Sequence, residues 1–140
     1  MKGQVSPIFK KVGDFVKEMK TFLGRDSILN APDLTTEDVE VPEWGGWVRV
    51  RALSGKERDI FEASVTGTHK KNKRMNLDNV RARLVQMTIV GEDGQPLFKR
   101  SDIEALGKKS AAALDRVFEV ATRLSGISEA DVDELTENFD

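Results

Sequence analysis

Hydrophobic and polar residues alternate most clearly over Val39–Ala52, on either side of a Gly-Gly pair. This period of two predicts two β-strands. Gly45–Gly46 is the predicted turn, because glycine readily adopts the positive φ that a two-residue hairpin loop requires. The predicted cross-strand pairs are Trp44–Trp47, Glu43–Val48, Pro42–Arg49, Val41–Val50 and Glu40–Arg51.

This register sorts the side chains of the hairpin by face. The valine face, as we call it, carries Val39, Val41, Val48 and Val50 together with Ala52. The opposite face is predicted to carry Trp44, Trp47, Arg49, Arg51 and Glu40. Pro42 cannot donate a ladder hydrogen bond, which predicts an edge strand. A lone hairpin is marginally stable in water, so helices must cover the valine face.

A helical period marks the first 24 residues. Ser6 and Pro7 are an N-cap and a first helical residue, and Gly24 is the predicted stop. Its apolar stripe is Ile8, Val12, Phe15, Val16, Met19, Phe22 and Leu23. The stripe fits a helix that packs on its own domain or on a second copy, which we favour, or a helix that docks on a partner or a membrane surface. Asp14 and Glu18 on the polar side weaken the membrane interpretation.

Helical signals also dominate the second half of the chain. Ser54–Glu57 is a capping box that begins a helix with the apolar stripe Ile60, Phe61 and Val65. Asp93–Gly94 predicts a turn between two short extended arms. A longer helix runs from Ser110 to Gly126, with the stripe Leu114, Val117, Phe118, Ala121 and Leu124.

We therefore predict an α+β protein, in which the small antiparallel hairpin Val39–Ala52 packs with several short helices and the C-terminal half is mostly helical. The predicted divisions are an N-terminal helix, a turn-rich connector with one helical turn near Asp26, a core domain and an acidic C-terminal helix or tail. Their ranges are 1–24, 25–38, 39–127 and 128–140.

Composition narrows the function classes. The chain has 140 residues, a formal net charge of −2 and 33% charged residues, as expected of a soluble globular protein without a field that favours nucleic acid or membrane. It has no cysteine and one histidine, His69, which lies among cations without a spaced partner. No Ca²⁺ loop or phosphate loop is recognisable. We expect no catalytic residues, no cofactor, no metal site, no signal peptide and no membrane span, and hence a cytoplasmic, non-enzymatic protein.

Two clusters are candidates for binding. The basic loop Lys70, Lys71, Lys73 and Arg74 could neutralise a few phosphates or become ordered on an acidic partner, although a solvated loop is the favoured interpretation because no aromatic residue interleaves it. Trp44 and Trp47 either form a partner-binding pair, since tryptophan is enriched in hot spots, or lie against the first helix or the connector.

A succession of short segments resembles the tail assembly chaperones of long-tailed, siphovirus-type bacteriophages and prophages. The segments are Asp38–Gly46, Val48–Arg51, Leu53–Asp59, Phe61–Glu62, Arg81–Leu84, Asp93–Gly94, Leu97–Phe98, Ala105–Gly107, Ser110–Leu114 and Arg123–Gly126. The likeness keeps the order of these segments over residues 19 to 138. Residues 1–18 fall outside it, and such a protein could begin at Met19, so the first helix is an extension, an alternative start or an added segment.

The resemblance implies a chaperone that binds the tape measure protein, keeps its long hydrophobic helix soluble and helps to recruit tail tube subunits. It also implies action in the host bacterial cytoplasm, absence from the mature virion, and a longer frameshift product that diverges near Glu134–Asp140. Candidate partner-binding residues are Trp44, Trp47, Ile8, Val12, Phe15, Met19 and Phe22. Self-association into a homo-oligomer is a further expectation. The alternatives are a nucleic-acid-binding accessory protein that uses Lys70–Arg74, and a structural tail component retained in the virion.

Overall fold

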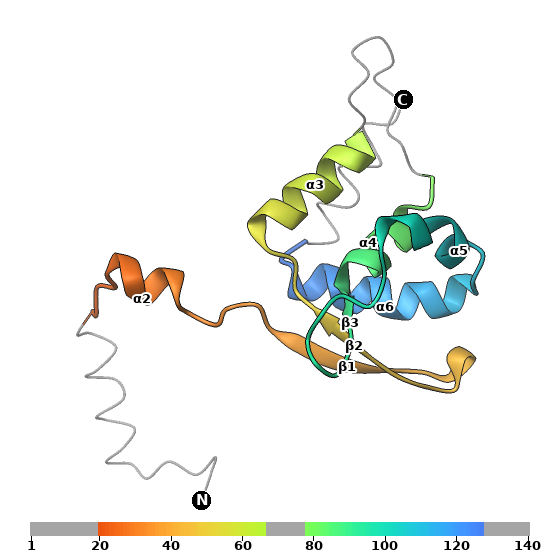
Figure 1. Cartoon of the computed structure of the whole chain (residues 1–140), viewed down its shortest axis with the longest axis horizontal. Coiled ribbons are helices and arrows are strands. Elements are labelled where there is room, and N and C mark those ends of the chain that lie inside the picture. The colour runs from red at the N-terminus through yellow and green to blue at the C-terminus, as the bar shows by residue number, and fades with distance from the viewer. Residues whose placement is uncertain (1–19, 67–77, 128–140) are drawn as a thin grey trace, which may run out of the picture. The chain divides into compact units, whose positions relative to one another are not determined.

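The computed structural model describes residues 20–66 and 78–127 (Figure 1). The chain divides into two units, Met1–Asp33 and Leu34–Asp140. In the first unit the described residues contain one short helix, α2 (Arg25–Leu29), which buries none of its side chains. It confirms the helical turn predicted near Asp26.

Residues 20–24 are not helical, so the predicted first helix does not extend to Gly24. Thr21 and Phe22 are weak helix formers and find no packing surface among the described residues of this unit.

The second unit is built on a three-stranded antiparallel sheet with the order β1-β2-β3. The strands are β1 (Thr36–Val41), β2 (Gly46–Arg51) and β3 (Ile89–Val90). The described residues of this unit also form the helices α3 (Gly55–Thr66), α4 (Val80–Thr88), α5 (Ile103–Gly107) and α6 (Ala111–Leu124), and the 3-10 turns η1 (Pro42–Trp44) and η2 (Arg100–Asp102). The predicted α+β class is confirmed, and β1 is the predicted edge strand.

The predicted hairpin register is wrong by four residues. The structure pairs Val41 with Gly46 and Val39 with Val48, so the loop has four residues rather than two. Pro42 begins η1 because its ring fixes a helical φ, and Gly45 ends the turn at φ 74°. The amide of Gly45 donates to the carbonyl of Pro42 at 3.0 Å. Because four is an even number, the shift leaves every strand residue on its predicted face.

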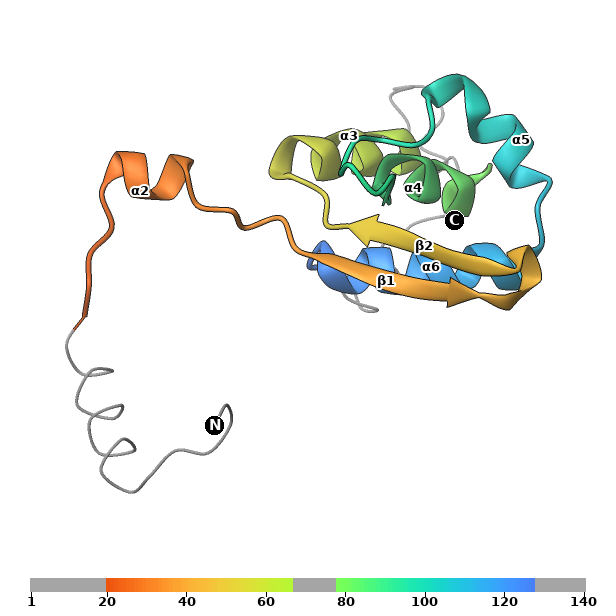
Figure 2. The same ribbon diagram turned by 60° about the horizontal axis from the view of Figure 1, so that its bottom comes forward.

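Helix α6 covers the valine face, and Figure 2 shows it behind the hairpin. Its buried side chains are Ala113, Leu114, Val117 and Ala121. They join Val41 and Val50 in one core that α3, α4 and α5 complete. Each fully buried leucine or valine contributes about 1.5–3 kcal/mol. This helix, predicted from Ser110 onwards, is confirmed: the Ser110 hydroxyl caps it at 3.2 Å from the amide of Ala113, and Gly126 follows its end at φ 72°.

The capping box of α3 is also confirmed. The amide of Glu57 donates to the Ser54 hydroxyl at 3.1 Å, and the amide of Ser54 donates to the Glu57 carboxylate at 2.9 Å. Phe61 is buried as predicted, but Ile60 is 42% exposed. Adjacent helical residues point about 100° apart, so Ile60 cannot share the buried stripe of Phe61 and Val65.

The turn at Asp93–Gly94 closes a small hairpin, as predicted. Val90 bridges to Pro96, and the amide of Leu97 donates to the carbonyl of Ile89 at 3.1 Å. The structure adds what the sequence did not indicate, namely that β3 also pairs with β2 and so joins this hairpin to the main sheet.

A single hydroxyl joins the end of α6 to the end of β2. The amide of Leu53 donates to the Ser125 hydroxyl at 2.9 Å. Ser125→Ala leaves this partly buried donor without its acceptor, and we expect a loss of about 1–3 kcal/mol in the free energy of unfolding, measured by urea denaturation. Ser64→Ala is the matched control, because the Ser64 hydroxyl only donates to the carbonyl of Phe61 in its own helix, and it should cost less than about 0.5 kcal/mol. Equal losses in the two variants would contradict this assignment.

Glu57 makes the stability of the domain depend on pH. Burial raises the pKa of Glu57, but the Ser54 amide and the Arg51 guanidinium outweigh it, and the pKa lies below its ordinary value of 4.5. A lowered carboxylate pKa stabilises the fold at neutral pH, and this contribution is lost as the pH falls through the folded-state pKa. We expect Glu57→Gln to be about 1 kcal/mol less stable than the unmodified chain at pH 7, through weakened capping, and the gap to narrow by pH 3. An equal gap at both pH values, measured by urea denaturation, would contradict this role.

Candidate partner-binding surfaces

Three of the predicted partner-binding residues lie in the described part of the chain: Phe22, Trp44 and Trp47. The others, together with the basic loop, lie outside the described residues. They are Ile8, Val12, Phe15, Met19, Lys70, Lys71, Lys73 and Arg74. The acidic C-terminal helix predicted over 128–140 also lies outside them.

Trp44 packs against the core, contrary to the prediction that it shares the opposite face with Trp47. The prediction placed Trp44 in a strand, whereas the residue lies in η1, where the backbone turns and the alternation of faces stops. Its neighbour Glu43 accepts from Arg116 of α6 at 2.9 Å, and this hydrogen bond holds the pKa of Glu43 below its ordinary value. The loop is thus attached to α6 through the Arg116–Glu43 pair, and to the core through the side chain of Trp44.

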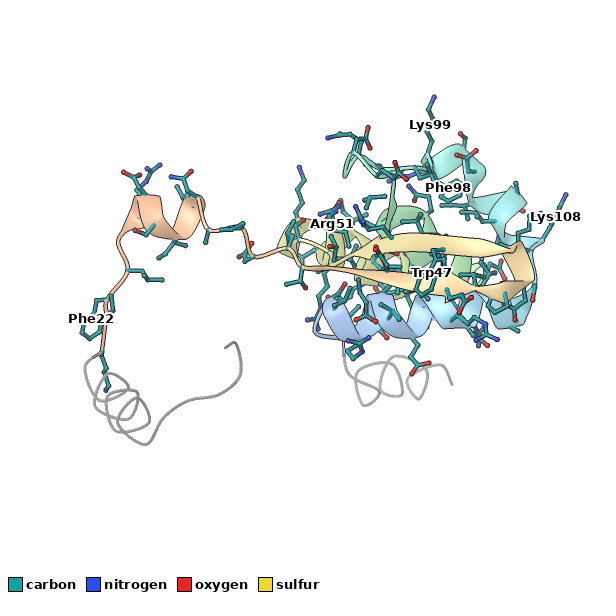
Figure 3. The ribbon with its side chains drawn as sticks, turned by 90° about the horizontal axis from the view of Figure 1, so that it is seen from below. Phe22, Trp47, Arg51, Phe98, Lys99 and Lys108 are labelled. Atoms are coloured by element: carbon teal, nitrogen blue, oxygen red, sulfur yellow. The ribbon has the colours of Figure 1, made fainter. Side chains whose placement is uncertain are left out.

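Trp47 is 67% exposed and lies on the open face of the hairpin, where Figure 3 labels it. The register places it directly opposite Glu40. Arg49, two residues further along β2, donates to the Asp38 carboxylate through Nε at 2.8 Å and through Nη2 at 3.3 Å. This hydrogen bonding lowers the pKa of Asp38 and replaces the predicted Glu40–Arg51 pair. Arg51 instead donates to Glu57 at 3.0 Å.

Four exposed apolar residues follow one another in the first unit. Phe22 is 88% exposed and Leu23, Ile28 and Leu29 are each more than half exposed. We call residues 22–29 the apolar segment. Phe22 is the one residue of this segment among the predicted partner-binding residues. The missed signal is that the four occur as two adjacent pairs, Phe22–Leu23 before α2 and Ile28–Leu29 at its end. Adjacent side chains point in different directions, so the members of each pair cannot both face one core.

Residues 20–66 and 78–127 contain no group of three or more carboxylate or imidazole side chains placed to hold a metal ion. None of the helices in these ranges has the length and apolar character needed to cross a bilayer.

Two comparisons with known proteins give the same result. A family model described as phage tail assembly chaperone matches residues 27–138. The solved structure of the tail assembly chaperone of bacteriophage HK97 is similar in fold, with 21% sequence identity and a TM-score of 0.52, over 71% of this chain and 94% of that one. No curated protein matches the chain.

The two tryptophans should differ in their contribution to stability. Trp44→Ala removes a large side chain that packs on the core, and we expect a loss of about 2–3 kcal/mol. Trp47→Ala removes an exposed ring and should change the free energy of unfolding by less than about 0.5 kcal/mol. Urea denaturation of both variants checks this. The reverse order would contradict the placement of Trp44 against the core.

Proposed function

Because the chain belongs to the phage tail assembly chaperone family, we propose that it binds the tape measure protein of its phage and keeps the long hydrophobic helix of that protein soluble during tail assembly. The family match over residues 27–138 is the observation that carries this proposal. In the same proposal the chain helps to recruit tail tube subunits, acts in the host cytoplasm and is absent from the mature virion. It acts through protein–protein contacts and catalyses no reaction.

The apolar segment supports the proposal. A chaperone for an apolar helix must expose apolar side chains before its client arrives, and soluble monomeric proteins rarely leave such side chains in groups. Phe22, Leu23, Ile28 and Leu29 bury little of their surface among the described residues of their unit. A client helix that packs on these side chains would remove apolar surface from water on both partners.

The folded domain would supply the other requirement, which is that the complex stays in solution. A third of the residues of the chain are charged. On the domain some of these charges form exposed ion pairs, as Arg81 does with Asp115 and Arg123 with Glu37. A client bound to the apolar segment would thus be attached to a hydrated, folded carrier.

Co-expression with the tape measure protein, followed by pull-down and size-exclusion chromatography, tests the proposal. We expect the two proteins to co-purify and the client to precipitate when it is expressed alone. The double variant Ile28→Ser/Leu29→Ser should lower the recovered complex about tenfold or more, because each lost apolar contact in an interface costs about 1 kcal/mol or more.

Leu97→Ser is the matched control for this experiment. Leu97 is 57% exposed but lies in the folded domain, between β3 and α5, so its variant should leave the yield of the complex unchanged. A client that is soluble by itself and forms no complex would overturn the proposed function. A complex that survives the double variant but not Leu97→Ser would move the binding surface to the domain.

A further inference from the structure

Strand β1 presents an unpaired backbone edge. The amide of Ala52 donates to the carbonyl of Thr35 at 2.9 Å, which makes these two residues a hydrogen-bonded pair of the antiparallel ladder. Because such pairs alternate with non-hydrogen-bonded pairs, Glu37 and Val39 also bond to β2. The backbone N–H and C=O groups of Thr36, Asp38 and Glu40 therefore point away from β2. No described strand lies on that side, since β1 ends the sheet.

The two ends of this edge are attached to α6. Arg123 donates to Glu37 near the start of β1, and Arg116 donates to Glu43 just after its end, both at 2.9 Å. Both pairs link α6 to the hairpin, and they flank the contact between α6 and the strands that buries the valine face. An edge that is already extended and attached in this way can accept another strand without a large loss of conformational entropy.

The side chains beside the edge select the charge of such a strand. Those of Thr36, Asp38 and Glu40 are exposed on the open face. Asp38 forms an ion pair with Arg49. Glu40 has no ion pair of this kind among the described residues, and its carboxylate acts on Arg116 only as a secondary charge that helps to raise the pKa of that guanidinium, after Glu43. Trp47, which lies directly opposite Glu40, offers its exposed ring. A cation placed beside Glu40 would meet a carboxylate and, within reach of a long side chain, the face of an indole ring.

We propose that the β1 edge binds an extended segment of another protein, which adds a fourth strand and places a lysine or arginine beside Glu40. The backbone groups of Thr36, Asp38 and Glu40 supply the affinity, and Glu40 with Trp47 supplies the preference for a basic residue. A second copy of the chain is a poor occupant. Antiparallel pairing of two β1 edges sets Asp38 against Asp38 when it is centred on Asp38, Asp38 against Glu40 when it is centred on Val39, and Glu40 against Glu40 when it is centred on Glu40. Like charges directly opposite one another are destabilising.

The test is a titration of the isotope-labelled full chain with a synthetic peptide, followed by NMR and amide hydrogen exchange. The probe is the end-blocked sequence Thr-Lys-Val-Lys-Val-Lys-Thr, which places lysines along one face of a strand. We expect the outward amides of Thr36, Asp38 and Glu40 to become at least fivefold slower to exchange. The amides of Glu37 and Val39, which already bond to β2, should not change.

Charge reversal provides the matched control. The same peptide with glutamate in place of lysine should bind the unmodified chain at least fivefold more weakly, and Glu40→Lys should reverse that preference. Asp38→Pro removes one outward N–H that β2 does not use, so it should abolish binding of the lysine peptide while the chain keeps its fold, as judged by its NMR spectrum.

Three results would overturn the proposal. The first is no binding of the lysine peptide at millimolar concentration. The second is equal binding of both peptides, which would make the acidic residues a guard against aggregation rather than a recognition feature. The third is slowed exchange of the same three amides at high protein concentration without peptide, which would assign the edge to a second copy of the chain.

Discussion

The need to bury the valine face determines where α6 packs and which surfaces of the sheet stay exposed. A two-stranded hairpin is marginal in water by itself, and its valines stabilise the fold only when another element covers them. Helix α6 covers them with the small residues Ala113 and Ala121 beside Leu114 and Val117, so that helix and sheet can approach closely. The polar sides of the same contact carry Arg116–Glu43 and Arg123–Glu37. Exposed pairs of this kind contribute little energy, but they orient the helix along the strand.

The same constraint explains which surfaces remain for partners. The sheet uses its valine face for the core and keeps its open face, with Trp47, and its β1 edge exposed. The apolar segment belongs to the other unit and buries none of its helix. The two surfaces that we propose for binding are therefore separated along the chain: apolar side chains for a helix, and a strand edge for an extended segment. In the proposed function the chain binds more than one protein during tail assembly, and separate surfaces would allow this.

The predicted hairpin shows where sequence reasoning succeeds and where it fails. The alternation of valines with polar residues determines the faces, and these survive a register error because that error is even. The position and length of the loop depend on Pro42 as well as on Gly45–Gly46. The fixed φ of Pro42 begins a 3-10 turn three residues before Gly45. A Gly-Gly pair is a strong turn signal, so the prediction placed the turn at Gly45–Gly46. Pro42 was taken only as a sign of an edge strand. Trp44 was misplaced as a direct result, because its face follows from the turn and not from the strand period.

The amino-acid sequence by itself determined the elements, their faces and the resemblance to a family, because capping boxes, glycine stops and hydrophobic periods act over a few neighbouring residues. It determined the beginnings of α3 and α6 in this way, at Ser54 and Ser110. Only the tertiary structure decided which long-range partners meet. The pairing of β3 with β2 and the Ser125 hydroxyl on the amide of Leu53 join residues whose separation along the chain carries no local signal, and packing alone selects them.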